Sequence, residues 1–211
     1  MKDFSEKYRH LLFGEFGTLN LTRISDPDEF YEKQIVDSIY PLEIFPEFTE
    51  DLKNAKLHVD IGFGGGFPLL PIAKKIDGLK SVGFEARRKK AEAVQEIAKR
   101  LDLNSVKTYH HRIEAVDLNT DCVVTLKAVG KIKDFLHKLN VSYKAKVTVY
   151  FYKGPNLLEL ESAPDNVGIF KKKLLQEYTL PSGHVRYFVA YEAQNVPRGT
   201  KKNLVKLSEL H

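Results

Sequence analysis

Residues 57–68 have the sequence Leu57-His58-Val59-Asp60-Ile61-Gly62-Phe63-Gly64-Gly65-Gly66-Phe67-Pro68. The pattern predicts a buried strand that ends in a glycine-rich turn and continues into a helix, with Pro68 suited to the first helical turn. Glycines in the turn allow backbone angles and a close approach that side chains would block, so we expect a small-molecule cofactor there. A dinucleotide fingerprint would need glycine at position 67 or 69, where the chain has phenylalanine and leucine. The turn therefore predicts a site for another kind of cofactor.

The length and composition fit one domain with a sizeable core. The 211 residues contain no apolar run near the roughly 20 residues that a membrane span needs, and the first residues lack the apolar segment of a secretion signal. We therefore expect a cytoplasmic protein with no membrane partner. The single cysteine, Cys122, excludes an internal disulfide and a cysteine-based metal site, and its apolar neighbours favour a buried thiol over a nucleophile.

The net charge of +5 arises in the C-terminal part of the chain. Residues 170–211 carry eight lysines and arginines against three glutamates, an excess equal to that of the whole chain. A basic surface on a neutral body favours a polyanionic partner, with nucleic acid first. A solvated tail whose lysines only keep the protein soluble explains the pattern equally well.

Helix and strand patterns order the chain around the glycine-rich turn. Ahead of it we expect two amphipathic helices, over residues 3–20 and about 30–39, the second preceded by a capping turn at residues 25–28 and ended by Pro41. Beyond it, strands alternate with helices, which predicts a parallel sheet with helices on both faces. The expected strands span residues 57–61, 79–85, 106–109, 122–126 and 146–152, and the expected helices span 67–77, 87–101 and 132–139. Residues 177–180 and 185–193 predict a closing antiparallel hairpin.

Two charged residues fall at the carboxyl ends of predicted strands, where open α/β sheets bind their ligands. Glu85 ends the second strand, and a carboxylate there can accept hydrogen bonds from both hydroxyls of a ribose; pairing with Arg87 or Arg88 is the alternative. Lys127 follows the fourth strand directly, where it can orient a cofactor carboxylate or meet a substrate phosphate; an ordinary surface lysine is the alternative.

No motif typical of metal or nucleophilic chemistry accompanies these residues. His110 and His111 are adjacent, so their rings diverge in an extended segment, and neither has a carboxylate or cysteine at ligand spacing. We therefore expect no metal site. A Ser-His-Asp order, a Walker lysine loop and a His-Glu-x-x-His motif are also absent from the sequence.

A glycine at every second position after an acidic residue is the pattern of S-adenosylmethionine (SAM) dependent methyltransferases, whose cofactor has no pyrophosphate. From about residue 20 to residue 193, the chain resembles more specifically the bacterial small-subunit ribosomal RNA methyltransferase G family, also known as the glucose-inhibited division protein B family. The resemblance rests on the glycine-rich turn with Pro71 and on Asn20-Leu21-Thr22, Asp26-Pro27, Ile35-Val36-Asp37-Ser38, Glu85 with Lys89-Lys90, Arg112-Ile113-Glu114, Asp121 leading to Lys127-Ala128, and Lys153-Gly154.

The resemblance implies a Rossmann-like class I SAM-dependent methyltransferase fold, an α/β fold with a mostly parallel sheet, a C-terminal antiparallel hairpin and an N-terminal helical extension. Residues 1–50 would form the extension, and residues 51–211 the methyltransferase domain with its basic C-terminal segment. The implied reaction is methyl transfer from SAM to N7 of a guanine in 16S ribosomal RNA, free or in the small ribosomal subunit, by a monomer. Guanine N7 has a free lone pair, so the reaction needs orientation and no general base. The alternatives are a SAM-dependent methyltransferase with another substrate and a non-catalytic RNA-binding protein.

The predicted site residues fall into three groups. The cofactor-binding residues are Asp60, Gly62, Phe63, Gly64, Gly66, Phe67, Glu85, Ile113, Glu114 and Lys127. Lys127 is also the predicted catalytic residue, and Lys153, Arg198, Lys201 and Lys202 are the predicted RNA contacts. The chain departs from the family pattern at Gln34, Leu69 and Lys127, where the family usually has histidine, a small residue and arginine.

Overall fold

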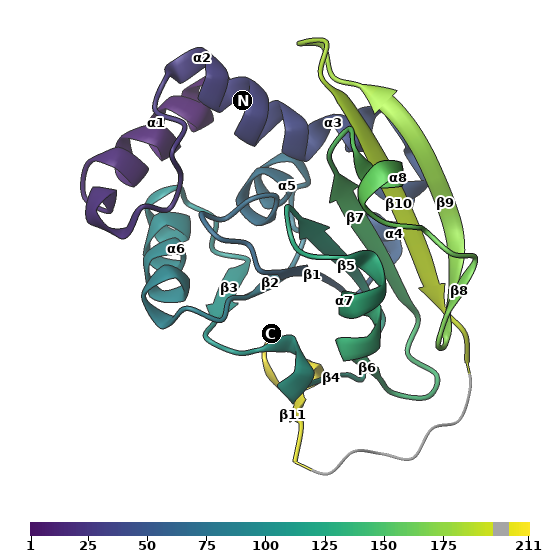
Figure 1. The fold of residues 1–211 in the computed structure, drawn as a ribbon. Helices are drawn as coiled ribbons and strands as arrows, with labels where there is room; N and C mark the ends of the chain where they lie inside the picture. The colour runs from purple at the N-terminus through teal and green to yellow at the C-terminus, as the bar shows by residue number, and fades with distance from the viewer. Residues whose placement is uncertain (196–202) are drawn as a thin grey trace.

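The computed structural model describes residues 1–195 and 203–211, and its main feature is a mixed sheet of eight strands (Figure 1). The strand order is β3-β2-β1-β5-β7-β10-β9-β8. The parallel strands are β1 (Leu57–Ile61), β2 (Ser81–Phe84), β3 (Val106–Tyr109), β5 (Cys122–Lys127) and β7 (Val147–Lys153). The antiparallel strands are β8 (Asn166–Val167), β9 (Phe170–Thr179) and β10 (Val185–Ala193). The predicted parallel sheet and closing hairpin are confirmed.

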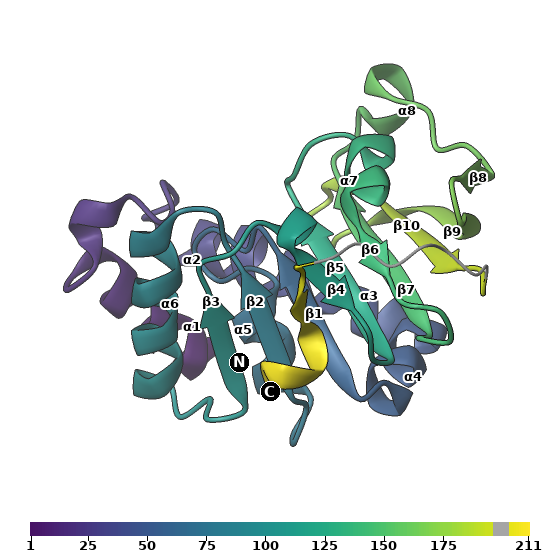
Figure 2. The ribbon, with the colours of Figure 1, turned by 90° about the horizontal axis from the view of Figure 1, so that it is seen from below.

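Helices cover both faces of this sheet. Those ahead of β1 are α1 (Lys2–Phe13), α2 (Pro27–Phe30), α3 (Asp37–Ile44) and α4 (Pro46–Asn54). Those between the strands are α5 (Leu69–Lys75), α6 (Arg88–Arg100), α7 (Ile132–Lys138) and α8 (Leu157–Leu160). Figure 2 shows α3 and α4 on one side of the sheet and α7 on the other, while α1 lies beside α6. In such a layered arrangement, the carboxyl ends of the parallel strands are the expected place for a site.

The side chains of β1 alternate between two cores. Val59 and Ile61 belong to the core that α7 covers. Asp60 faces α5 on the opposite side, where its carboxylate accepts a hydrogen bond from the Leu69 N–H. Such alternation with a period of two is what a strand buried on both faces requires.

A buried polar row crosses the middle of the sheet on the α5 side. His58 Nδ1 lies 3.2 Å from Ser81 Oγ on β2, and His58 Nε2 lies 2.9 Å from Thr125 Oγ1 on β5. All three side chains are buried, and burial lowers the pKa of His58 to about 3. The imidazole is therefore neutral at physiological pH and holds three strands together as a hydrogen-bonded bridge.

The N-terminal helices differ from the expectation in two places. The first helix ends at Phe13, because Gly14 caps it, and only a short 3₁₀ turn, Gly17–Leu19, follows. Pro41 does not end the second helix: the chain passes from α2 through a π-helical turn, Tyr31–Val36, into α3, and Pro41 lies inside α3. Proline removes one backbone hydrogen bond there, and the burial of Ile39 and Leu42 carries the helix one turn further.

A second, three-stranded parallel sheet was not expected from the sequence. It has the order β11-β4-β6, with β4 (Val116–Leu118), β6 (Asn140–Val141) and β11 (Val205–Lys206). Two of these strands have only two residues, too short for a periodic pattern. The sheet places the C-terminal turn, Leu207–Glu209, against the core on the α7 side, where Leu207 is fully buried.

The boundary predicted after residue 50 falls inside α4, and residues of α1–α4 share one core with those of α5 and α6. The division into an extension and a domain stays a prediction. In the described part of the chain, no helix is both long and apolar enough to cross a membrane. Cys122 is a buried free thiol as predicted, and burial raises its pKa well above the usual value.

Candidate cofactor and substrate site

The site lies where the strand order reverses. The chain leaves β1 toward β2 and β3 and later returns to β5 on the other side of β1. The carboxyl ends of β1 and β5 therefore lie at the switch point of the sheet, which is where open α/β sheets bind ligands. Gly62 follows β1 and Lys127 ends β5 at this point.

Two glycines of the turn lie close to this switch point. Gly62 and Gly64 have φ angles of 71° and 56°, in the left-handed region that favours glycine. A Cβ added at Gly64 would meet no protein atom nearer than 4.0 Å, so that side of the turn faces open space. A Cβ at Gly62 would lie 3.1 Å from Val129 Cγ1, in the loop after β5. The first part of the turn therefore offers bare backbone to a ligand.

The next two glycines face the N-terminal helices instead. A Cβ at Gly66 would lie 2.3 Å from the Tyr8 hydroxyl, and one at Gly65 would lie 2.8 Å from the Leu21 carbonyl oxygen. The Tyr8 hydroxyl donates a short hydrogen bond to the Gly65 carbonyl oxygen. Glycine is required at these two positions by packing, so α1 supports the turn from behind.

The two phenylalanines of the turn are buried in this support. Phe67 stacks on Tyr8 with ring centroids 5.0 Å apart and packs edge-on against Phe30 at 5.8 Å. Phe63 covers Gly83 of β2, where an added Cβ would lie 2.6 Å from its ring. Only 2% of Phe63 and 7% of Phe67 is exposed, and the Phe63 carbonyl oxygen accepts hydrogen bonds from the Gly66 and Phe67 N–H groups, so both residues serve first to hold the turn together.

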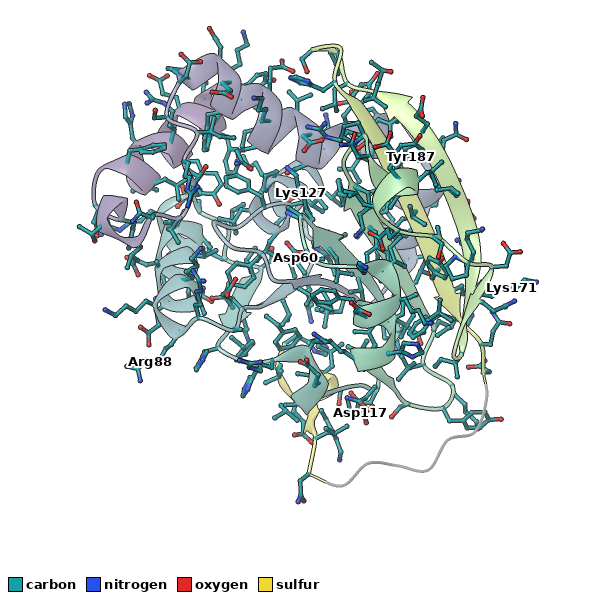
Figure 3. The ribbon with its side chains drawn as sticks, in the orientation of Figure 1. Asp60, Arg88, Asp117, Lys127, Lys171 and Tyr187 are labelled. Carbon is teal, nitrogen blue, oxygen red and sulfur yellow. The ribbon has the colours of Figure 1, made fainter. Side chains whose placement is uncertain are left out.

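Asp60 lies beneath the turn. Its Oδ2 accepts a hydrogen bond of 2.8 Å from the Leu69 N–H at the start of α5, and its Oδ1 is buried with no hydrogen-bond partner. Burial raises the pKa of Asp60 to about 7, and the nearby Lys127 charge opposes that shift. Figure 3 shows Asp60 and Lys127 near one another in the centre of the molecule. Asp60 therefore ties strand, turn and helix together.

Glu85 reaches across to the same turn. Its Oε2 accepts a hydrogen bond of 3.1 Å from the Gly64 N–H, and its Oε1 accepts one of 3.0 Å from the Arg87 N–H. The sequence left Arg88 open as an ion-pair partner of Glu85. It pairs with Glu92 instead and points outward from α6 (Figure 3). Each carboxylate oxygen keeps acceptor capacity for a ribose hydroxyl.

Lys127 is held by the N-terminal helices. Its Nζ lies 3.0 Å from Asp37 Oδ2, 3.1 Å from the Lys33 carbonyl oxygen and 3.5 Å from Ser38 Oγ. Its side chain is 11% exposed; burial lowers its pKa, and the Asp37 carboxylate opposes that shift. All three N–H donors have protein partners, so a contact with a cofactor or substrate requires one of them to be exchanged.

The remaining predicted cofactor residues follow β3. Ile113 and Glu114 begin a 3₁₀ turn, Ile113–Ala115. Ile113 is buried in the core on the α7 side, and Glu114 is exposed, with its Oε1 3.5 Å from Lys138 Nζ. The Ile113 carbonyl oxygen accepts from the Val116 N–H and the Glu114 carbonyl oxygen from Asn140 Nδ2, so both carbonyls have partners and the contact with the adenine ring stays a prediction.

A cavity of about 700 Å³ opens at the ends of β5 and β7. Its walls come from the loop before α7 and from the segment around α8, and they include Val129, which also abuts Gly62. Ala128 at its rim has a φ of 55°, a strained angle for a residue with a side chain, of the kind that clusters at functional sites. The cavity and the glycine-rich turn are thus neighbours.

Lys153, a predicted RNA contact, lies in the wall of this cavity with 10% of its side chain exposed. Its Nζ donates to Glu161 Oε1 at 2.6 Å and to the Gly130 carbonyl oxygen at 2.7 Å. The other predicted RNA contacts, Arg198, Lys201 and Lys202, lie outside the described residues. The sequence did not single out Tyr8, Asp37 or Glu161 for the site. Each of them holds one residue of the site: Tyr8 contacts Gly65, Asp37 contacts Lys127 and Glu161 contacts Lys153.

Among residues 1–195 and 203–211, no group of three or more histidine, cysteine, aspartate or glutamate side chains is arranged to hold a metal ion. His110 Nε2 lies 3.1 Å from the Ala86 carbonyl oxygen.

The turn and Glu85 fit SAM by chemistry: bare backbone and open space at Gly64 admit a ligand, and the adjacent carboxylate can hold a ribose.

Solved structures share this architecture. A SAM-dependent methyltransferase from Aquifex aeolicus has a TM-score of 0.54 at 15% identity, with 85% of this chain and 97% of that chain covered. A mutant of MtNAS in complex with S-adenosylmethionine has a TM-score of 0.56 at 18% identity, with 92% of this chain and 73% of that chain covered. The protein has the class I SAM-dependent methyltransferase fold, as predicted.

Sequence relatives define the family. The family model described as rRNA small subunit methyltransferase G matches residues 2–183. Proteins named ribosomal RNA small subunit methyltransferase G are 31% identical in Microcystis aeruginosa (84% of this chain, 83% of the relative) and 33% identical in Streptococcus pneumoniae (90% and 82%). The chain belongs to the rRNA small subunit methyltransferase G family, which confirms the predicted family, the enzyme class and SAM as the methyl donor.

Proposed function

We propose that the protein transfers a methyl group from SAM to N7 of a guanine in 16S ribosomal RNA. The observation that carries this proposal furthest is the contact between the glycine-rich turn and the cavity: Val129 lines the cavity and lies against Gly62 of the turn. A cofactor over the turn and a base in the cavity would then meet at the end of β5. The names of the relatives supply the class of RNA.

SAM, when bound, supplies a methyl group on a positively charged sulfur atom. The residues of the chain have to hold it against the guanine. Gly62 and Gly64 give it room, and Glu85 would accept hydrogen bonds from its ribose. Guanine N7 already has its lone pair free, so no residue has to remove a proton. Orientation of this kind is worth up to about 7–11 kcal/mol of the barrier.

The cofactor-binding residues, the catalytic role of Lys127 and the RNA contacts are part of the proposal. Four cations of the basic C-terminal segment have partners: Lys172 with Asp165, Lys173 with Glu47 and Asp51, Arg186 with Asp37, and Lys206 with Glu209. The basic residues that remain for RNA within the described part of that segment include Lys171, which is exposed near the start of β9 (Figure 3). A monomer in the cytoplasm completes the proposal.

The test is methyl transfer from labelled SAM to 16S RNA, presented free and as the small ribosomal subunit. Cleavage of the RNA chain at 7-methylguanine then maps the modified base. We expect label at a single guanine N7 with the wild-type protein and none with Gly64→Asp. Label in another position or in protein would favour the first alternative, a methyltransferase with another substrate. RNA binding without transfer would favour the second, a non-catalytic binder.

A further inference from the structure

The cavity contains an ion pair to which the proposed function gives no specific role beyond a general RNA contact of Lys153. Lys153 Nζ and Glu161 Oε1 lie 2.6 Å apart, and both residues line the cavity. Their side chains are only 10% and 11% exposed. Taking two charges out of water is costly and needs fixed partners, so their position in a cavity wall requires an explanation.

Fixed partners hold both groups in one orientation. Glu161 Oε2 accepts a hydrogen bond of 2.6 Å from the Ile132 N–H at the start of α7. Lys153 Nζ donates to the Gly130 carbonyl oxygen as well as to Glu161. Two of the three ammonium donors are thereby used, and each carboxylate oxygen has one protein partner. One N–H donor and two acceptor sites remain on the pair.

We propose that the Lys153–Glu161 pair recognises the Watson–Crick edge of a guanine in this cavity. That edge presents one acceptor, O6, and two donors, N1–H and the 2-amino group, which complement one ammonium donor and a carboxylate. Adenine presents a donor and an acceptor there, so it would leave the pair mismatched. The assignment rests on the proposed function and deepens it, because it names the residues that select guanine over other bases.

The rest of the cavity fits a nucleobase. Its volume of about 700 Å³ lies within the usual range for ligand pockets. Val129, Leu157 and Leu160 give it apolar walls, and Leu160 is 72% exposed, so it offers a free surface on which a base can pack. Recognition through O6, N1 and the 2-amino group leaves N7 unused, and N7 is the atom that the proposed reaction methylates.

The test measures binding of mononucleotides to the full-length protein by NMR titration. GMP, IMP and AMP serve as probes, since IMP lacks only the 2-amino group of GMP. We expect the wild-type protein to prefer GMP over AMP by roughly 5- to 150-fold, with IMP between them. Glu161→Gln replaces an acceptor by a donor and should abolish both differences, and Lys153→Gln should reduce the preference over AMP.

Glu43→Gln is the matched control, because Glu43 pairs with Lys75 at 3.0 Å outside the cavity. It should keep the wild-type order of affinities. The proposal is overturned if the wild-type protein fails to bind GMP or does not discriminate, or if Glu161→Gln weakens GMP and AMP by the same factor, as loss of a structural tie would. If the protein methylates guanine N7 without this selectivity, the role of the Lys153–Glu161 pair is refuted and the proposed function stands. If it shows the selectivity but does not methylate 16S RNA, only the proposed function is refuted.

Discussion

Asp37 Oδ2 lies 3.0 Å from Lys127 Nζ, across 90 residues of sequence, and Asp37 Oδ1 lies 3.0 Å from Arg186 Nε. One carboxylate at the start of α3 thus holds the end of β5 and the start of β10. The side chain of Asp37 is only 7% exposed, so its charge depends on these two cations. The relationship explains why an Asp-Ser motif far upstream accompanies the lysine in the sequence.

Removal of the Asp37 charge should destabilise the fold. In Asp37→Asn, the buried Lys127 ammonium loses its ionic partner, and breaking a buried pair in this way costs about 3–5 kcal/mol. Unfolding in urea measures the change. Asp165→Asn is the control, because Asp165 pairs with Lys172 but is 83% exposed, and an ion pair so exposed to solvent contributes little to stability. Equal losses in the two variants would contradict the role of Asp37.

Gly64 should be needed for SAM, and not only for the turn. Gly64→Ala and Gly78→Ala both place a side chain at a positive φ, 56° and 71°, so each should lose about 1–2 kcal/mol of stability. Calorimetric titration with SAM should separate the two variants. Gly78 lies in open space after α5, so Gly78→Ala should keep the wild-type affinity for SAM. Gly64→Ala should weaken SAM binding, and Gly64→Asp should abolish it. Unchanged SAM affinity in Gly64→Asp would refute the cofactor assignment of the turn.

Tyr8 should couple the N-terminal helix to cofactor binding. Tyr8→Phe leaves the Gly65 carbonyl oxygen without its buried donor, which costs about 1–3 kcal/mol, and it loosens the turn from behind. We expect a lower melting temperature and weaker SAM binding, with SAM restoring part of the stability. Tyr187→Phe removes an exposed hydrogen bond to Glu177 and should change neither quantity. If Tyr8→Phe lost stability but kept full SAM affinity, the hydroxyl would serve folding alone.

His58 and Asp60 should give opposite contributions to the pH dependence of stability. Burial lowers the pKa of His58 from 6.5 to about 3, so its contribution is present above pH 6.5 and is lost as the pH falls toward 3. Burial raises the pKa of Asp60 from 3.8 to about 7, so its contribution is present below pH 3.8 and is lost as the pH rises through 7. The two slopes therefore oppose each other between about pH 4 and 6.5.

Single variants should reveal each slope. Relative to the wild type, His58→Gln should make the free energy of unfolding fall more steeply with rising pH in that window, by up to about 1.4 kcal/mol per pH unit. Asp60→Asn should change the slope by a similar amount in the opposite direction. Urea unfolding at half-unit pH steps measures both. The exposed His137→Gln is the control, and parallel curves for all four proteins would contradict the assigned shifts.

The sequence predicts the parts of the fold that repeat and misses those that depend on distant partners. The strand of residues 57–61 and its turn are predictable because five consecutive buried residues meet glycines that need positive φ angles. Pro41 misleads, because the burial of Ile39 and Leu42 outweighs the lost hydrogen bond. The three-stranded sheet has strands of two or three residues, so only tertiary pairing defines it.

The same distinction applies to the site. Glycine spacing and Glu85 are local signals, and the structure brings the turn and Glu85 together at the strand ends. The partners of Lys127 and Lys153 lie on other elements, so no local pattern connects Asp37 or Glu161 with them. Periodicity offers one retrospective signal: Phe4, Tyr8 and Leu12 share the buried stripe of α1, and a tyrosine in such a stripe needs a partner for its hydroxyl.

RNA binding should depend on salt through the C-terminal lysines. Each phosphate contact releases counterions, so neutralising two contacts should flatten the plot of log affinity against log salt by about one to two units. We expect this change for Lys201→Gln with Lys202→Gln, measured by fluorescence anisotropy with labelled 16S RNA fragments. Lys53→Gln with Lys56→Gln is the matched control: both lysines are exposed near the amino end of β1, opposite the site, and the pair carries the same charge. A salt-insensitive affinity, or equal flattening in both double variants, would show that the C-terminal lysines serve solubility and not RNA contact.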